Sequence, residues 1–159
     1  MTVPPALEGL KAKFDHVAIG GRAFEPMLAL YRDILGGVPT YGGTNTALGF
    51  AVQSLGFPDG KHIELITAVP GSTFLDSFLA RTGGLGGLHH VTFTVPSVHE
   101  AIEVLHARGY ATFGERPDDP SWAEAFVHPR DAGGVLLQVA TPGEHGDEGE
   151  SEHWESSGA

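Results

Sequence analysis

The chain has 159 residues, enough for one well-buried domain or for two small modules that share a core. Its net charge of −11 argues against nucleic acid or an anionic membrane as a partner, because both bind basic surfaces. Having no cysteine, the chain has neither disulfides nor thiolate metal sites, so nitrogen and oxygen atoms must hold any bound metal.

Residues 1–13 are predicted to form a polar lead-in. They lack the apolar core of a signal peptide, and no apolar run in the chain approaches the roughly 20 residues that span a bilayer. We therefore expect a cytoplasmic protein.

Residues 14–68 predict a first βαβββ module. A short β-rich strand, FDHVAI at residues 14–19, precedes a helix over residues 24–35, whose apolar positions recur every three or four residues. Gly36 ends this helix. Three strands are predicted near residues 38–41, 48–55 and 61–67, with Pro58-Asp59-Gly60 as the last turn.

Residues 69–87 form a connector, in which a short helix over residues 73–81 is predicted with Ser72 as its cap. The connector ends in GGLGG. This run lacks the spacing of a phosphate-binding loop and precedes a strand, so a hinge between modules is the better interpretation.

Residues 88–141 repeat the plan. A strand over residues 89–95 leads to a capping box, Ser97 with Glu100, for a helix through Arg108. Strands follow near residues 110–114, 123–128 and 134–140. Residues 142–159 are predicted to be a disordered acidic tail. Its acids are Glu144, Asp147, Glu148, Glu150, Glu152 and Glu155.

Equivalent residues of the two modules are 74 positions apart. His90 follows His16 by this step, Gln138 follows Glu64, and Gly134 follows Gly60. One internal duplication explains all of these matches. The fold class is therefore α+β, built from two βαβββ modules.

Side chains alternate along a strand, so the strands can be divided into two faces. The apolar face, predicted to pack under the helices, comprises Val17, Ile19, Ile63, Leu65, Val91, Phe93, Val95, Val135, Leu137 and Val139. The other face, predicted to line a cavity, comprises His16, Ala18, His62, Glu64, Ile66, His90, Thr92, Thr94, Leu136, Gln138 and Ala140.

The cavity face carries four candidate metal ligands: His16, Glu64, His90 and Gln138. Two imidazoles, a carboxylate and an amide oxygen suit one divalent ion per chain, such as Co, Ni, Mn, Fe or Zn. A single histidine at a strand start is commonly structural, but an acid such as Glu64 inside an apolar strand needs a partner. His128 could enter the cavity or cap its hairpin.

These segments resemble the vicinal oxygen chelate superfamily (glyoxalase/bleomycin resistance/dioxygenase). The resemblance is closest to its methylmalonyl-CoA epimerase-like branch, through FDHVAI, LALYRDILG, IELI, GGLHHVTFTV and AFVHPRDAGGVLLQVA. Over residues 14–141 it implies a cup-shaped mixed sheet with helices on the outer face. It also implies one metal held by His16, Glu64, His90 and position 138.

Two features depart from that branch. Position 138 is usually Glu in such epimerases, whereas here it is Gln138. The branch also carries a catalytic Glu between the helix and the middle strand, where TYGGTNTALGF, residues 40–50, contains no acid.

The leading hypothesis is a metal-dependent isomerase, epimerase or lyase that removes a proton next to a carbonyl, the metal stabilising the enolate. Glu64 would be both ligand and base. Alternatives are an Fe(II)-dependent dioxygenase, since His16, His90 and Glu64 form a two-histidine, one-carboxylate set, and a non-catalytic protein that binds a natural product. The expected partners are a small molecule carrying a carbonyl or vicinal oxygens and a second copy of the chain in a homodimer.

Overall fold

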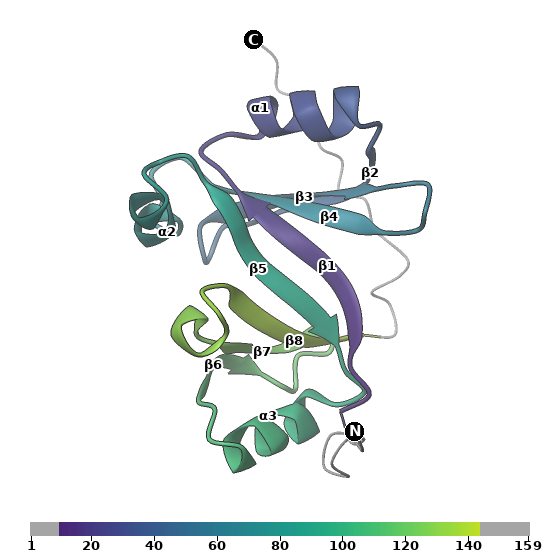
Figure 1. The fold of residues 1–159 in the computed structure, drawn as a ribbon, viewed down its shortest axis with the longest axis vertical. Coiled ribbons are helices and arrows are strands. Elements are labelled where there is room, and N and C mark those ends of the chain that lie inside the picture. The colour runs from purple at the N-terminus through teal and green to yellow at the C-terminus, as the bar shows by residue number, and fades with distance from the viewer. Residues whose placement is uncertain (1–9, 144–159) are drawn as a thin grey trace. The chain divides into compact units, whose positions relative to one another are not determined.

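A computed structural model describes residues 10–143, and its elements follow the predicted plan (Figure 1). The first module and the connector contain β1 (Lys13–Gly20), α1 (Phe24–Leu28), the π-helix η2 (Ala29–Ile34), β2 (Val38–Asn45), β3 (Phe50–Gly56), β4 (His62–Ala68) and α2 (Asp76–Arg81). The second module contains β5 (Gly87–Thr94), α3 (Val98–Ala107), β6 (Thr112–Arg116), β7 (Trp122–Val127), the 3-10 turn η3 (Pro129–Asp131) and β8 (Leu136–Pro142).

The α+β class with repeated βαβββ modules is confirmed. The predicted acidic tail lies almost wholly outside the described residues, and over residues 10–143 no helix is long and apolar enough to cross a membrane.

The described residues form two compact units that divide both central strands. The N-terminal unit holds residues 17–89, and the C-terminal unit holds residues 10–16 and 90–143. Strand order runs β2-β3-β4-β1 on one side and β1-β5-β8-β7-β6 on the other, so β1 and β5 pass through both units. Because β8 pairs parallel with β5 and antiparallel with β7, the sheet is mixed, as predicted.

The strands β3 and β4 pair antiparallel and supply most of the buried apolar side chains of the N-terminal unit. Directly opposite residues of an antiparallel pair share a face. Leu55 and Leu65 are fully buried, and on the opposite face Ala18, Val52 and Ile66 form a small apolar cluster. β4 therefore buries apolar side chains on both of its faces.

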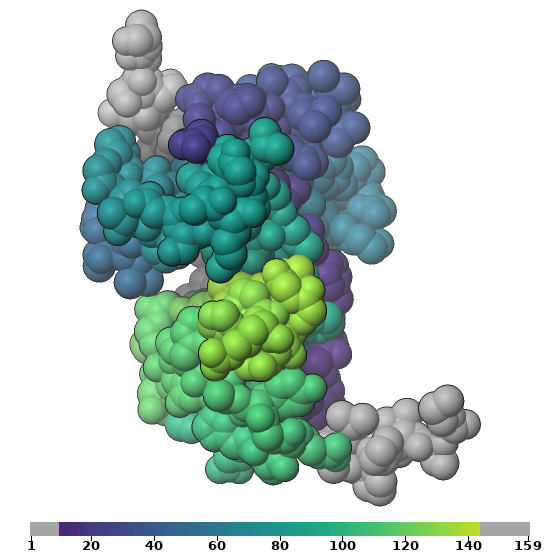
Figure 2. Space-filling view, turned by 60° about the vertical axis from the view of Figure 1, so that its left-hand side comes forward, coloured from purple at the N-terminus to yellow at the C-terminus, as the bar shows by residue number. Residues whose placement is uncertain are grey.

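The C-terminal unit is built around α3. The predicted cap is confirmed, because Ser97 Oγ accepts a hydrogen bond of 3.2 Å from the Glu100 backbone N–H. Ala101 then packs against Ala125 and Val139 in the core. The turn before β8 lies on the surface beside this helix (Figure 2, yellow-green and green).

Two helical predictions need correction. Residues 24–35 do not form one α-helix: α1 gives way to η2, and the Leu35 N–H bonds back five residues to the Leu30 carbonyl at 3.0 Å. The predicted cap at Ser72 is wrong, since α2 has Leu75 at its cap position. Ser72 Oγ accepts instead from the Phe74 N–H, a local turn that competes with helix capping.

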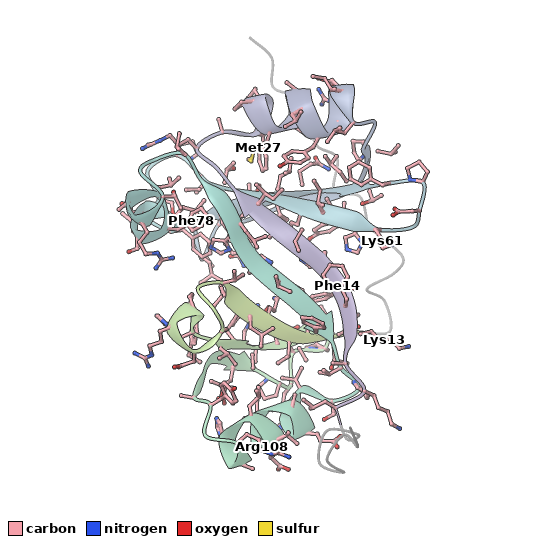
Figure 3. All side chains as sticks on the ribbon, viewed as in Figure 1. Lys13, Phe14, Met27, Lys61, Phe78 and Arg108 are labelled. Atoms are coloured by element: carbon pink, nitrogen blue, oxygen red, sulfur yellow. The ribbon has the colours of Figure 1, made fainter. Side chains whose placement is uncertain are left out.

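The apolar face is less covered than predicted. Leu65, Val95 and Val139 are buried, but the other predicted members are only half-buried. On the same side of the strands, Phe14 is 52% exposed beside β5 (Figure 3), where its ring meets Phe93 at 5.9 Å.

Open grooves between helix and sheet explain this exposure. In the N-terminal unit a groove of about 500 Å³ is lined by Tyr31 and Ile63 among other residues. In the C-terminal unit a groove of about 460 Å³ is lined by Leu105 and Leu137. These residue pairs correspond by the 74-residue step, so the grooves follow the internal repeat.

Candidate metal centre

Two buried histidines lie next to each other in the C-terminal unit. His16 on β1 is 6% exposed and His90 on β5 is 7% exposed. Their ring centroids are 5.6 Å apart, and each ring offers a nitrogen within 4.8 Å of the other's. Two imidazoles at this separation can share one metal ion.

Asp15 sets the tautomer of His16. Its Oδ2 lies 2.6 Å from His16 Nδ1. An ionised carboxylate only accepts hydrogen bonds, so Nδ1 carries a hydrogen, and the lone pair of a neutral ring is then on Nε2. A carboxylate behind an imidazole is the usual arrangement for orienting a metal-binding histidine.

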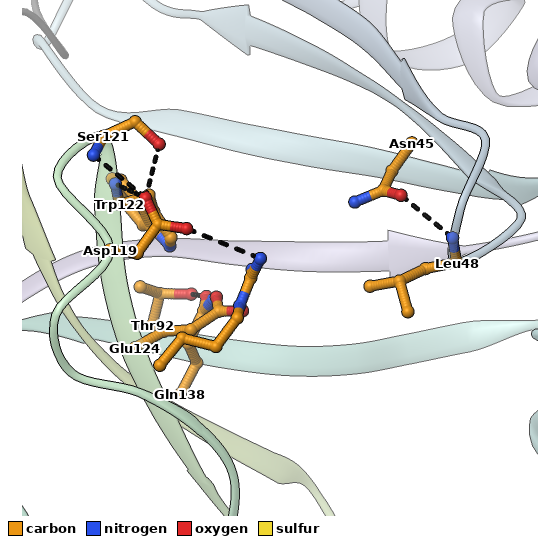
Figure 4. A network of polar contacts seen from close by, with 9 residues as sticks. Asn45, Leu48, Thr92, Asp119, Ser121, Trp122, Glu124 and Gln138 are labelled. Atoms are coloured by element: carbon orange, nitrogen blue, oxygen red, sulfur yellow. Dashed lines mark hydrogen bonds and ion pairs between the residues drawn. The ribbon is translucent and has the colours of Figure 1, made fainter.

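A chain of hydrogen bonds runs through the interior of the same unit from Thr92 through Gln138 to Glu124 (Figure 4). Thr92 Oγ1 lies 3.2 Å from His16 Nε2 and donates to Gln138 Oε1 at 2.6 Å. Gln138 Nε2 donates to Glu124 Oε2, also at 2.6 Å. Thr92, Gln138 and Glu124 are all buried, and over residues 10–143 no buried side-chain nitrogen or oxygen lacks a hydrogen-bond partner.

Arg116 closes this chain at the surface. Its Nε donates to Glu124 Oε1 at 3.1 Å, and its terminal nitrogen donates to the same oxygen. The hydrogen bond with Glu124 raises the pKa of Arg116. Arg116 also lies 3.6 Å from Asp119. The Ser121 hydroxyl and the backbone N–H groups of Ser121 and Trp122 lower the pKa of Asp119 to about 2.

Glu64 lies on β4, in the N-terminal unit. It is half-buried and directly opposite Ser54 of β3, on the face that continues into the apolar cluster of Val52 and Ile66. It is the acid that the sequence singled out within an apolar strand.

Four other histidines, His89, His99, His106 and His128, have different environments. His128 Nδ1 accepts from the Arg130 N–H at 3.2 Å, so His128 caps its turn. His99 and His106 are exposed. Burial, with Arg81 nearby, lowers the pKa of His89 to about 4, and its ring packs 5.0 Å from Phe78.

Residues 15–126 match the family model described as the glyoxalase/bleomycin resistance protein/dioxygenase superfamily. The chain belongs to this superfamily.

Among curated members, the mitochondrial methylmalonyl-CoA epimerases of Dictyostelium discoideum and Mus musculus are each 25% identical to this chain over 129 residues. These matches cover 80% of this chain and 76% and 71% of those proteins. These relatives are enzymes, and the similarity supports an epimerase-like function.

Solved structures agree on the fold. The methylmalonyl-CoA epimerase of Mycobacterium tuberculosis has a TM-score of 0.72 at 23% identity, over 89% of this chain and 93% of that one. A Streptomyces coelicolor epimerase variant in complex with 2-nitronate-propionyl-CoA has a TM-score of 0.66 at 23% identity, over 82% of this chain and 96% of that one. The resemblance to the vicinal oxygen chelate fold is confirmed.

The donor atoms of the C-terminal unit fit the divalent ion expected in this superfamily. Asp15 takes the hydrogen of His16 Nδ1, and the partners of Gln138 leave its amide oxygen next to Thr92 Oγ1, the atom that also lies 3.2 Å from His16 Nε2. Nitrogen and oxygen donors of this kind suit Mn, Fe, Co, Ni or Zn.

Sequence reasoning missed Glu124 and Asp15. Glu124 stands in WAEAFV, an acid inside an otherwise apolar strand, which is the same signal that selected Glu64. Asp15 directly precedes His16, but alternation assigns neighbouring residues to opposite faces and so hides their contact.

Proposed function

We propose that the chain is a divalent-metal-dependent epimerase that removes and returns a proton next to the carbonyl of a coenzyme A thioester. The observation that carries this proposal is the buried pair of His16 and His90, oriented by Asp15, in a chain similar to methylmalonyl-CoA epimerases over 80% of its length. The substrate class is taken from those relatives and from the solved relative that holds 2-nitronate-propionyl-CoA.

The proposed ligands of the ion are His16, Glu64, His90 and Gln138. Glu64 is included on the sequence pattern, since strand alternation and the 74-residue step place it on the face that carries His16, His90 and Gln138. Once bound, a divalent ion would supply Lewis-acid polarisation of the substrate carbonyl.

Glu64 is the proposed base. The C–H bond next to the thioester carbonyl breaks, the proton passes to a carboxylate oxygen of Glu64, and the electron pair moves onto the carbonyl oxygen. A proton from solvent then adds to the opposite face of the planar enolate, which restores the C–H bond with inverted configuration, and Glu64 releases the first proton to solvent. The reaction consumes no oxidant or second reactant. The position of Glu64 supports this role, since its carboxylate is half-buried next to an apolar cluster.

Deuterium incorporation tests this function. Methylmalonyl-CoA is incubated in D2O with Co²⁺-loaded protein, and deuterium at the carbon between its two carbonyl groups is followed by mass spectrometry against the uncatalysed rate. Glu64→Gln is expected to lower the catalysed rate about 100-fold or more. Glu103→Gln, a change at an exposed acid of α3, should leave it unchanged. Failure to exchange any of a panel of coenzyme A thioesters, hemithioacetals and sugar ketones would contradict the proposal.

The donor set also supports a second candidate, oxygen chemistry with Fe²⁺. Two histidines and one carboxylate are the ligands of many non-haem iron oxygenases. We rank this candidate lower, because Gln138 would occupy a position that such chemistry leaves open. Iron in the isolated protein and oxygen uptake with a catechol would favour it. Tight binding of an aromatic natural product without any metal would instead indicate a non-catalytic binding protein.

We further propose that the chain forms a homodimer. Phe14 and Phe93 present a partly exposed aromatic pair on β1 and β5, which an identical partner could cover. Light scattering after gel filtration should give twice the chain mass for the wild type. Phe14→Glu should give the monomer mass, whereas Lys13→Glu should remain dimeric. A monomeric wild type would exclude the proposal.

A further inference from the structure

The geometry points to Glu124 as a positioning residue: held by Arg116, it fixes the amide of Gln138 so that the amide oxygen can serve as an uncharged metal ligand. This inference rests on the metal site proposed above and adds the residue that determines how Gln138 takes part in it.

The orientation of the Gln138 amide follows from its two partners. Nitrogen and oxygen of an amide are told apart by their hydrogen bonds. An ionised Glu124 can only accept, so the atom 2.6 Å from its Oε2 is the amide nitrogen. The amide oxygen then faces the other way, where Thr92 Oγ1 donates to it at 2.6 Å.

The same hydroxyl connects the amide oxygen to His16. Thr92 is fully buried, and its Oγ1 lies 3.2 Å from His16 Nε2. Thr92 donates its one hydrogen to the oxygen of Gln138, and the direction of its contact with His16 Nε2 depends on the His16 tautomer. The oxygen of Gln138 and Nε2 of His16 are both neighbours of this one hydroxyl, so the two atoms that would hold the ion lie close together.

Glu124 is itself held rigidly. It is buried on β7, and a buried carboxylate is costly unless it is paired. In the register of β6 and β7, Arg116 stands opposite Glu124 and donates to Oε1 through two nitrogens. Oε2 is thereby left for Gln138. The ion pair with Arg116 holds the Glu124 carboxylate in place, and that carboxylate in turn sets the orientation of the Gln138 amide.

The pair also explains why a glutamine occupies position 138. A carboxylate there would place two like charges about a hydrogen bond's length apart, which is strongly unfavourable in a buried site. The negative charge lies on the neighbouring strand, next to Arg116, and position 138 offers a neutral oxygen.

Co²⁺ titration of the full chain tests the inference, with calorimetry for affinity and visible absorption for the ligand set. Glu124→Gln keeps the shape of the side chain but no longer obliges the Gln138 nitrogen to face it. We expect Co²⁺ affinity to fall about 10-fold or more, the usual effect of losing an outer partner of a metal ligand. Glu115→Gln, on β6 outside the buried chain of contacts, is the matched control and should not change the affinity.

A double-mutant cycle separates positioning from a general structural effect. In a Gln138→Met background, Glu124→Gln should cause no further loss of Co²⁺ affinity, because Glu124 acts through Gln138. An equal loss in both backgrounds would overturn the inference. The reversed pair, Glu124→Gln with Gln138→Glu, should bind Co²⁺ more tightly than the wild type, whereas Gln138→Glu alone should not.

The possible results distinguish a failure of this inference from a failure of the proposed function. If the wild type binds Co²⁺ through His16, Glu64 and His90 while Glu124→Gln leaves the affinity and the spectrum unchanged, the inference fails and the metal site remains. If the wild type binds no divalent ion, both fail. In that case a Gln138 side-chain amide that NMR finds fixed against Glu124 would reveal a purely structural contact.

Discussion

His16 Nδ1 lies 2.6 Å from Oδ2 of Asp15, the residue immediately before it on β1. This contact gives His16 a defined tautomer in the C-terminal unit, independently of any ligand. Asp15 is therefore expected to influence metal binding without being a ligand.

Asp15→Asn should weaken Co²⁺ binding about 10-fold, because an asparagine can accept or donate and no longer fixes the hydrogen on Nδ1. Asp33→Asn is the matched control, since Asp33 is exposed and pairs with its neighbour Arg32. Calorimetric titration of both variants checks this. Equal affinities in the wild type and Asp15→Asn would show that the contact does not orient His16.

Thr92→Val should destabilise the protein by about 1–3 kcal/mol, since it removes the only hydroxyl between two buried polar side chains while keeping the side-chain shape. Thr92→Ser retains the hydroxyl and should recover most of that loss. Urea unfolding monitored by fluorescence measures both variants. A Thr92→Val variant as stable as the wild type would show that water or a rearranged side chain replaces the hydroxyl.

The sequence predicts those parts of this site that depend on patterns along the chain, but not those that depend on how separate strands pair. Strand alternation and the 74-residue repeat were sufficient to place His16, His90 and Gln138 on one face, because both act along the chain. Glu124 bonds to Gln138 across the β7–β8 pair, in a register that sequence periodicity does not define. The family resemblance implies a ligand at position 138 and contains no information about Glu124 on the neighbouring strand β7.

The fold shows a similar division. The cap at Ser97 was predictable because a serine at the start of a helix accepts from the backbone N–H three residues later, a contact that is local in sequence. The change from α1 to η2 was not, because residues 24–35 keep the apolar spacing of an α-helix. Coverage of the apolar face also failed as a prediction, since it depends on how closely η2 and α3 approach the sheet.

The glycine run before β5 offers a matched pair of substitutions in the N-terminal unit. Gly83 and Gly86 both have positive φ, +63° and +81°. A Cβ at Gly83 would meet nothing within 4 Å, whereas one at Gly86 would lie 2.2 Å from the Gly20 carbonyl oxygen. Gly83→Ala should cost about 1–2 kcal/mol from backbone strain alone, and Gly86→Ala should cost distinctly more. Urea unfolding of the two variants gives the comparison, and equal losses would argue against the close approach of Gly86 to β1.

Low pH should lower the free energy of unfolding, because it protonates Asp119, which lies next to Arg116. The Ser121 hydroxyl, with the backbone N–H groups of Ser121 and Trp122, lowers the pKa of Asp119 to about 2 from its usual 3.8. The unfolded chain therefore binds more protons than the folded one between these values, so the stability that Asp119 contributes is complete above about pH 4 and is lost as the pH falls toward 2.

The charged groups facing Asp119 are Arg116, at 3.6 Å, and Glu124, which shares that guanidinium. Asp119→Asn should be less stable than the wild type at pH 7 and equally stable near pH 2. Thermal unfolding across this range measures the difference, and Asp118→Asn, at an exposed neighbour, controls for the loss of one negative charge. A stability difference that stays constant from pH 7 to pH 2 would mean that the hydrogen bonds to Asp119 do not depend on its charge.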